Sequence, residues 1–154
     1  MDWKITKGIP EDAAAIAQFQ VDMARESEGT ELDYNLVLRG VTLGLQDEAK
    51  GTYFIARDEA GTPLGSLLLT REWSDWTCTW YWWIQSVFIR PEYRRQGAFS
   101  CLYETVRASA REEGSACLRL YVDRGNSAAQ ECYRKQGMDE CHYLMFEETL
   151  PPLD

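Results

Sequence analysis

Hydrophobic and polar positions follow two different periods along the chain, which predicts a mixture of strands and helices. Apolar and polar residues alternate at residues 3–7, as they do in a short, half-exposed strand. Pro10 then opens a stretch in which Ile16, Phe19 and Met23 fall at helical spacing. We therefore expect the chain to begin with a strand followed by a helix.

The next part of the pattern predicts a second helix and then three strands. The helix is expected to end near Asp47 after a break at residues 27–30, although Gly40 and Gly44 lie within it. Runs of strand-forming residues, separated by the turn sequences GTP and WSDW, follow at residues 52–57, 63–71 and 78–89. We expect these three strands to form an antiparallel meander.

An amphipathic helix is expected at residues 97–113. Its apolar face consists of Phe99, Leu102, Val106 and Ala110, and the glycine that follows the helix at position 114 would stop it. Residues 90–96 connect the last strand of the meander to this helix.

The C-terminal part of the sequence adds one more helix and two short strands. The helix is expected at residues 127–136, between strands at residues 118–122 and 141–147. With 154 residues the chain is long enough for one domain with its own core, which we place at residues 1–150, followed by a short tail at residues 151–154. The order of elements predicts the α+β, or mixed α/β, class.

The chain is strongly acidic, and this charge limits its partners. Its 25 Asp and Glu residues outnumber 16 Lys and Arg residues, which gives a formal net charge of -9. Such a molecule should repel nucleic acid and anionic membrane surfaces, so we expect neither as a partner. The sequence contains neither a basic start followed by an apolar run nor a long apolar segment, and we expect a cytoplasmic protein. The oligomeric state stays open, a homodimer included.

Cysteine and histidine give little sign of metal or redox chemistry. The five cysteines have wide, irregular spacings that fit neither a disulfide framework nor paired zinc ligands. We expect no metal site, and we expect the cysteines to be reduced and mostly buried. The single histidine, His142, lies in a strand-like stretch, where a structural role is the more common one.

One stretch concentrates positive charge in front of the helix expected at residues 97–113. Residues 90–100 read RPEYRRQGAFS and offer no Ser, Thr, Asp or Asn next to Gly97 that would cap the first amide groups of the helix. Gly97 lets the backbone approach a ligand, the helix dipole favours an anion, and Arg94 and Arg95 add positive charge. The stretch predicts a phosphate site; the alternative is a solvated loop whose arginines pair with surface acids.

The phosphate site does not have the sequence of a nucleoside triphosphate loop. That loop ends in Gly-Lys-Ser/Thr, and here the corresponding ending is absent. A kinase or ATPase is therefore disfavoured.

Two blocks of the sequence, VFIRPEYRRQGAFSCLYETV and NSAAQECYRKQGM, resemble the GNAT superfamily of N-acetyltransferases. The family motif is a strand, then Arg/Gln-x-x-Gly-x-Gly/Ala, then a helix. Arg94, Gly97 and Phe99 match it in register, although Phe99 stands where the family has Gly or Ala. The second block matches at Asn126, Ala129, Tyr133 and Gly137.

This resemblance implies a fold. We expect a mostly antiparallel central sheet of about six or seven strands, flanked by about four helices. The sheet should splay apart between the strand that ends near Ile89 and the strand near Leu118–Val122.

The resemblance also implies acetyl-coenzyme A as co-substrate. Its amide-containing arm would bond to the strand edge at Val87, Phe88 and Ile89, as an added strand does. The residues expected to bind its pyrophosphate are Arg94, Arg95, Gln96, Gly97, Ala98, Phe99 and Ser100, and Asn126 is expected to touch the cofactor while it caps its own helix.

The reaction that the resemblance implies is direct attack of a primary amine on the thioester. Tyr133 would protonate the leaving thiolate, because a phenol with a pKa of about 10 carries its proton at neutral pH. Its alternative role is to pack on an apolar face with Ala129 and Cys132. In the competing hypothesis the chain is a non-catalytic acetyl-coenzyme A sensor or interaction module, and Tyr133 is structural.

The acceptor is expected to be a small-molecule or protein amine, and a cationic one. Acidic residues Glu26, Glu28, Glu31 and Asp33 lie in the segment between the first two helices, which borders the acceptor site in similar enzymes. Of these we choose Glu28 and Glu31 as acceptor-binding residues. The alternative is a solvated acidic loop.

Aromatic residues of the strand at 78–89 offer a second acceptor surface. Tyr81 and Trp83 would form a cage for an ammonium group if their side chains share one face with Gln85, Val87 and Ile89. Gln85 could orient a water molecule there. Core packing is the alternative for these aromatic residues.

Overall fold

The computed structural model describes residues 1–153 as two compact units, Met1–Tyr121 and a smaller one that begins at Val122. The larger unit contains one sheet of five strands. They are β1 (Lys4–Lys7), β2 (Thr52–Arg57), β3 (Pro63–Ser74), β4 (Thr79–Ile89) and β5 (Cys117–Arg119). The prediction of a single domain over residues 1–150 stays a prediction.

The strands lie in the sheet in the order in which they occur in the sequence. Each of the first three pairs is antiparallel, and β5 alone runs parallel to its neighbour β4. The predicted meander is therefore confirmed, and β2 has the expected bounds. Strand β3 continues past the expected end at Arg71, because Ser74 still pairs with Thr79 across a tight hairpin.

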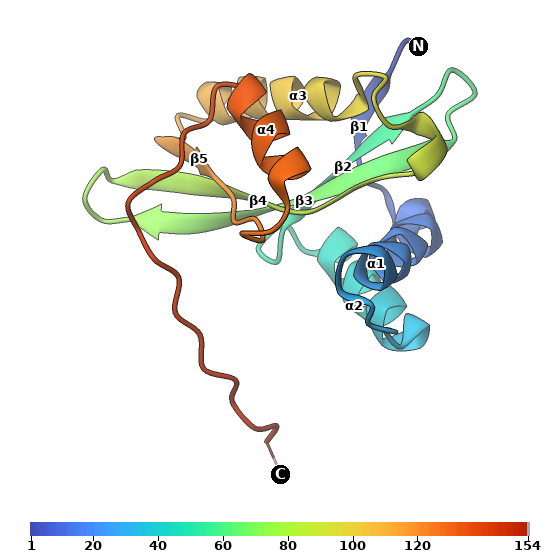
Figure 1. Ribbon diagram of the computed structural model, residues 1–154, viewed down its shortest axis with the longest axis horizontal. Helices are drawn as coiled ribbons and strands as arrows, with labels where there is room; N and C mark the ends of the chain where they lie inside the picture. The colour runs from blue at the N-terminus through green and yellow to red at the C-terminus, as the bar shows by residue number, and fades with distance from the viewer. Residues whose placement is uncertain (154) are drawn as a thin grey trace. The chain divides into compact units, whose positions relative to one another are not determined.

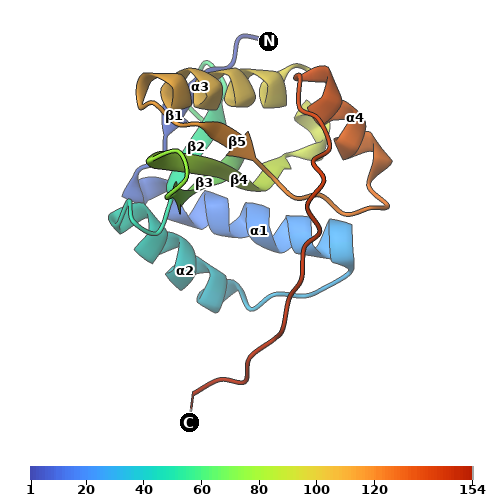
Figure 2. The ribbon, with the colours of Figure 1, turned by 90° about the vertical axis from the view of Figure 1, so that its left-hand side faces the viewer.

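Helices cover both faces of this sheet (Figures 1 and 2). Helices α1 and α2 lie on one face and α3 lies on the other, so the larger unit has three layers. The helical segments are η1 (Pro10–Asp12), α1 (Ala13–Glu28), α2 (Tyr34–Gln46), η2 (Pro91–Tyr93) and α3 (Ala98–Glu112).

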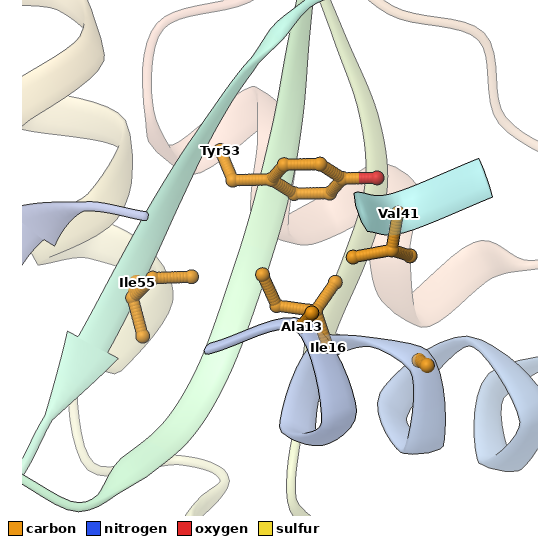
Figure 3. Close-up of a cluster of buried hydrophobic side chains, with 6 residues drawn as sticks. Ala13, Ile16, Val41, Tyr53 and Ile55 are labelled. Atoms are coloured by element: carbon orange, nitrogen blue, oxygen red, sulfur yellow. The ribbon is translucent and has the colours of Figure 1, made fainter. Parts of the chain in front are cut away.

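A buried apolar cluster joins α1 and α2 to β2 (Figure 3). Ile16 and Ile55 are fully buried in it, and the ring of Tyr53 lies beside them. Gly44 of α2 is buried against Tyr53, and a Cβ atom at that position would come within 3.3 Å of the ring. Glycine is therefore needed there for close packing, and the helix forms despite the glycines in its sequence.

The smaller unit contains helix α4 (Ser127–Lys135) and, after it, no regular element within the described residues. The expected strand at residues 141–147 is therefore wrong. A strand needs a neighbour to accept and donate its backbone hydrogen bonds, and none of the strands described here pairs with this segment. The sheet consequently has five strands instead of the expected six or seven.

The cysteines also differ from expectation. None of them forms a disulfide, but none is buried either: Cys78 and Cys141 are exposed, and the other three are half-buried. His142 stacks on its neighbour Tyr143, with 4.2 Å between the ring centroids. Within residues 1–153, no helix is long and apolar enough to cross a membrane.

Candidate functional site

Strands β4 and β5 pair over only part of their length. The pairs are Tyr81 with Cys117, Trp82 with Leu118, and Trp83 with Arg119, after which β4 continues to Ile89 without β5. Strand β5 ends at Arg119 instead of reaching Val122. The predicted splay between these two strands is confirmed. Among the strands of residues 1–153, none pairs with the second half of β4 on this side, so that edge is open.

A β-bulge lies in this open half of β4. Ser66 pairs with Phe88 and Leu68 pairs with Gln85, so two residues of β4, Ser86 and Val87, stand opposite one residue of β3. Ser86 has a left-handed backbone with φ of 52°, which is uncommon for a residue other than glycine. The extra residue bends the strand and interrupts the regular pairing of its backbone groups.

The bulge also changes which side chains share a face. Tyr81 and Trp83 are the cross-strand partners of Glu72 and Thr70. These side chains lie on the face of the sheet that packs against α1 and α2 at β2. Beyond the bulge it is Phe88 that reaches this face, since its ring lies 5.5 Å from that of Phe19 in α1. The expectation that Val87 and Ile89 share the face of Tyr81, Trp83 and Gln85 is therefore wrong, because the inserted residue shifts the two-residue period by one.

The expected glycine turn follows β4. We use this term for residues 94–100, which end in the first turn of α3. Gly97 precedes the helix with a left-handed φ of 84° and provides no side-chain cap, as predicted. A Cβ atom built on Gly97 would meet no atom within 4 Å, so the space in front of the turn is open. An α-helix contains no acceptors for the amide groups of its first turn, which favours an anion at this place.

Phe99 does not take the core position that the helical spacing predicted. The fully or nearly fully buried residues of α3 include Ala98 and Leu102, whereas Phe99 is half-buried. Its ring lies 6.0 Å from that of Tyr103, one turn further along the helix. The side chain of Phe99 therefore lies along the helix and not in the core.

Arg94 makes internal contacts instead of extending into solvent. Its Nε atom donates a hydrogen bond of 2.8 Å to the carbonyl oxygen of Ile89 at the end of β4. Its two terminal nitrogens donate to both carboxylate oxygens of Glu26, near the end of α1, with 2.8 Å between Nη2 and Oε2. These hydrogen bonds lower the pKa of the Glu26 carboxyl. The pair joins helix α1 to the glycine turn.

The side chains of Arg95 and Gln96, the next two residues of the turn, make different contacts from that of Arg94. The side chain of Arg95 is exposed, and we find no ion pair or hydrogen bond for it among residues 1–153. Its backbone is left-handed, with φ of 60°. Gln96 donates from its side chain to the carbonyl of Glu92, and its own carbonyl accepts a hydrogen bond from Trp3. Arg95 is therefore the cation of the turn that stays available to a ligand.

Arg119 lies against the rings of Tyr81 and Trp83, the two aromatic residues of the expected ammonium cage. The guanidinium of Arg119 lies 4.2 Å from the ring centroid of Tyr81 and 5.9 Å from that of Trp83. Its Nη1 atom also bonds to Glu72 over 3.0 Å. The expected ammonium cage is thus already in contact with Arg119, which the sequence reasoning missed because only the parallel register of β4 and β5 brings it there.

Polar groups next to this cage are also engaged. The side-chain amide of Gln85 donates a short hydrogen bond to the hydroxyl of Thr70. The ring of Trp83 lies 6.5 Å from that of Tyr121, a second residue that the sequence reasoning missed.

The acidic residues at the end of α1 and before α2 differ in their contacts. Asp33 caps helix α2, since its Oδ1 atom accepts hydrogen bonds from Asn35 and Leu36. Glu31 accepts two hydrogen bonds from Arg25, of 2.7 and 3.0 Å, and these lower the pKa of its carboxyl. Glu28 ends α1 and is exposed. Binding of an acceptor by Glu28 and Glu31 stays a prediction.

The smaller unit holds the other predicted site residues. Asn126 caps helix α4, and its Oδ1 atom accepts a hydrogen bond of 3.1 Å from the amide of Ala129. Burial raises the pKa of the Tyr133 phenol, with a further contribution from Cys132. The phenol therefore keeps its proton at neutral pH, as a general acid must.

Comparison with known families gives one match over most of the chain. The model of the acetyltransferase (GNAT) family matches residues 14–138. The chain belongs to this family. The resemblance of the two sequence blocks is thereby confirmed, and the open half of β4 and the glycine turn are parts of an acetyltransferase fold.

Solved structures of acetyltransferases have the same fold as this chain. A possible acetyltransferase from Clostridium difficile 630 is 35% identical, with 97% of this chain and 98% of that chain covered and a TM-score of 0.90. A probable acetyltransferase is 23% identical, with 98% and 99% covered and a TM-score of 0.84. An aminoglycoside acetyltransferase from an uncultured soil metagenomic sample, in complex with sisomicin, is 18% identical, with 97% of each chain covered and a TM-score of 0.77.

No protein of curated function matches the chain. Within the described part of this GNAT chain, no group of three or more His, Cys, Asp or Glu residues is arranged to hold a metal ion.

Proposed function

We propose that this GNAT chain is an N-acetyltransferase that moves the acetyl group of acetyl-coenzyme A to a primary amine, by direct attack in a ternary complex. The observation that carries the proposal is the open half of β4, which contains the bulge at Ser86 and is followed by a helix whose N-cap residue, Gly97, provides no side-chain cap. An open strand edge followed by an anion site fits a long ligand that has amides at one end and phosphates at the other.

The residues present fit the co-substrate. The backbone of Val87, Phe88 and Ile89 lies on the open edge, where it would bond to the amides of the pantetheine arm. The open space at Gly97 would receive the pyrophosphate, and the exposed guanidinium of Arg95 would add a charge-assisted contact. Gln96, Ala98, Phe99 and Ser100 belong to the same turn and would contribute backbone groups.

Arg94 is not proposed to contact the phosphate directly. Because its side chain bonds to Ile89 and Glu26, Arg94 would fix the turn relative to the end of β4. Its charge still lies in the turn, but Glu26 compensates it locally. We therefore assign direct phosphate contact to Arg95 and positioning to Arg94.

The chemical step needs a neutral amine and an acid for the leaving group. The nitrogen lone pair attacks the thioester carbonyl, the carbon–sulfur bond breaks, and the thiolate takes the phenolic proton of Tyr133. The nitrogen loses one proton as the amide forms, and this proton restores the phenol of Tyr133. An alkyl ammonium with a pKa near 10.4 is neutral in only one molecule in ~2,500 at pH 7, so proton removal costs about 4.6 kcal/mol. The lowered pKa values of Glu26 and Glu31 make both carboxylates weak bases, which favours a water path for this proton.

A cationic acceptor fits the acidic segment between α1 and α2 better than it fits the aromatic residues. Arg119 already brings a positive charge to Tyr81 and Trp83, and a second cation there would be repelled. Glu28 is exposed and would attract an amine. The sisomicin complex of the soil aminoglycoside acetyltransferase makes aminoglycosides one class to test, beside polyamines, amino acids and protein amines.

A thiol-release screen tests the proposal. The full chain is incubated with acetyl-coenzyme A and an amine library, and intact-mass detection identifies acetylated products. We expect release of coenzyme A that depends on one class of amine. Binding of acetyl-coenzyme A without turnover over the whole library would contradict the proposal and would favour a sensor.

A further inference from the structure

The backbone of the glycine turn has an unfavourable conformation. Arg95 is left-handed with φ of 60°, which is uncommon for a residue other than glycine, and Gly97 is left-handed as well. A residue keeps such a conformation only where the surrounding structure fixes the backbone around it. The shape of the turn therefore depends on the contacts of the residues next to Arg95.

Both neighbours of Arg95 are held by distant parts of the chain. On one side, the indole N–H of Trp3 donates a hydrogen bond of 2.8 Å to the carbonyl oxygen of Gln96. On the other side, the guanidinium of Arg94 donates to both carboxylate oxygens of Glu26. Glu26 therefore acts on the turn through Arg94.

Helix α1 reaches the end of β4 and the turn at two points along its length. The ring of Phe19 lies 5.5 Å from that of Phe88, and Glu26, about two helical turns further on, binds Arg94. The guanidinium of Arg94 also lies 5.4 Å from the centroid of the Phe88 ring. All four residues belong to the larger unit, so α1, β4 and the turn are joined within it.

We propose that Glu26 is a positioning residue for the cofactor: through Arg94 it holds the glycine turn in the conformation that receives the diphosphate of coenzyme A. The inference rests on the proposed function, because it requires a diphosphate at this turn. The carboxylate of Glu26 has the same sign of charge as the ligand, so its direct electrostatic effect on binding is unfavourable. A favourable net effect of Glu26 can arise only through the groups that it holds in place.

The coenzyme A affinity of a charge-neutral variant tests the proposal, because the two effects of Glu26 have opposite signs. Glu26→Gln removes a negative charge, which by electrostatics alone would tighten binding, but its amide offers Arg94 one acceptor oxygen in place of two. We expect calorimetry on the full chain to give a Kd about three- to tenfold higher than that of the wild type. The Tm should fall only slightly, since both side chains are more than one third exposed.

Glu72→Gln is the matched control. Glu72 binds Arg119 over 3.0 Å, and these side chains are 47% and 30% exposed, close to the 49% and 38% of Glu26 and Arg94. The control removes the same charge from a pair that joins β3 to β5, and we expect its Kd for coenzyme A to stay within about twofold of the wild type. Equal or tighter binding by Glu26→Gln, or an equal loss in both variants, would contradict the proposal.

A double-mutant cycle decides whether Glu26 acts through Arg94. Arg94→Lys keeps the positive charge but removes the planar fork that binds both oxygens of Glu26. We expect the double variant with Glu26→Gln to bind coenzyme A about as weakly as the weaker single variant, and additive losses would overturn the positioning role. A wild type that binds no coenzyme A would refute the proposed function itself, whereas normal wild-type binding that Glu26→Gln leaves unchanged would refute this inference alone.

Discussion

The replacement of Gly97 by alanine separates ligand contact from backbone strain. Gly97 has a left-handed φ of 84°, and a Cβ atom there would meet no protein atom within 4 Å. The only cost in the free protein is the unfavourable backbone conformation, about 1–2 kcal/mol. For a chain of this size, we expect the Tm to fall by about 2–8 °C.

In the complex the same methyl group would lie where the phosphate approaches. Loss of hydrogen bonds from the turn to a charged phosphate costs about 1.5–3 kcal/mol, so we expect Gly97→Ala to weaken coenzyme A binding by roughly 10–150-fold. Titration calorimetry measures this affinity, and a thermal melt of the same sample measures stability.

Gly114 provides the control at the other end of α3. Its φ is 73°, and a Cβ atom there would also meet nothing within 4 Å. Gly114→Ala should therefore lower the Tm to a similar degree and leave the affinity unchanged. If Gly97→Ala lowers the Tm like its control but binds coenzyme A within twofold of the wild type, the glycine turn does not contact the phosphates.

Three further substitutions test the acid, the arginines of the turn and the ion pair. Tyr133→Phe should lower kcat by about 100-fold with little change in coenzyme A affinity, and unchanged turnover would remove Tyr133 as the acid. Arg95→Ala should weaken coenzyme A binding and reduce its salt dependence without lowering the Tm, whereas Arg94→Ala should lower the Tm as well; isothermal titration at two salt concentrations and thermal melts distinguish them. Arg94 lowers the pKa of Glu26 below 4.5, so the stabilisation from their pair is present above that pH and is lost as the pH falls through the lowered value. Because both side chains are more than one third exposed, Glu26→Gln should cost only about 0.2–1 kcal/mol at pH 7 and less at pH 3, and an equal loss at both pH values in thermal melts would argue against the pair.

The sequence by itself determined most of the local structure. Period and turn residues are local signals, which is why β2 was predicted with its observed bounds and why the helix after Gly97 was placed to within a residue. The lack of a cap at that helix is also local, because it depends only on the residues next to Gly97. The family followed from the same stretch and from the block around Tyr133.

Contacts between distant parts of the chain were decided by the tertiary structure alone. Arg94 appeared to be a free cation, but folding brings Glu26 to it across 68 positions of sequence. The bulge at Ser86 moved Phe88 to the other face, since a single inserted residue shifts the period of every side chain beyond it. Arg119 reached Tyr81 only through the parallel pairing of β5 with β4.

The segment at residues 141–147 shows the physical limit of the sequence pattern. Its run of strand-forming residues favours a strand, but a strand exists only where a neighbour takes its backbone hydrogen bonds. Strand propensity depends on the residues of the segment alone, whereas pairing with another strand depends on the fold of the whole chain.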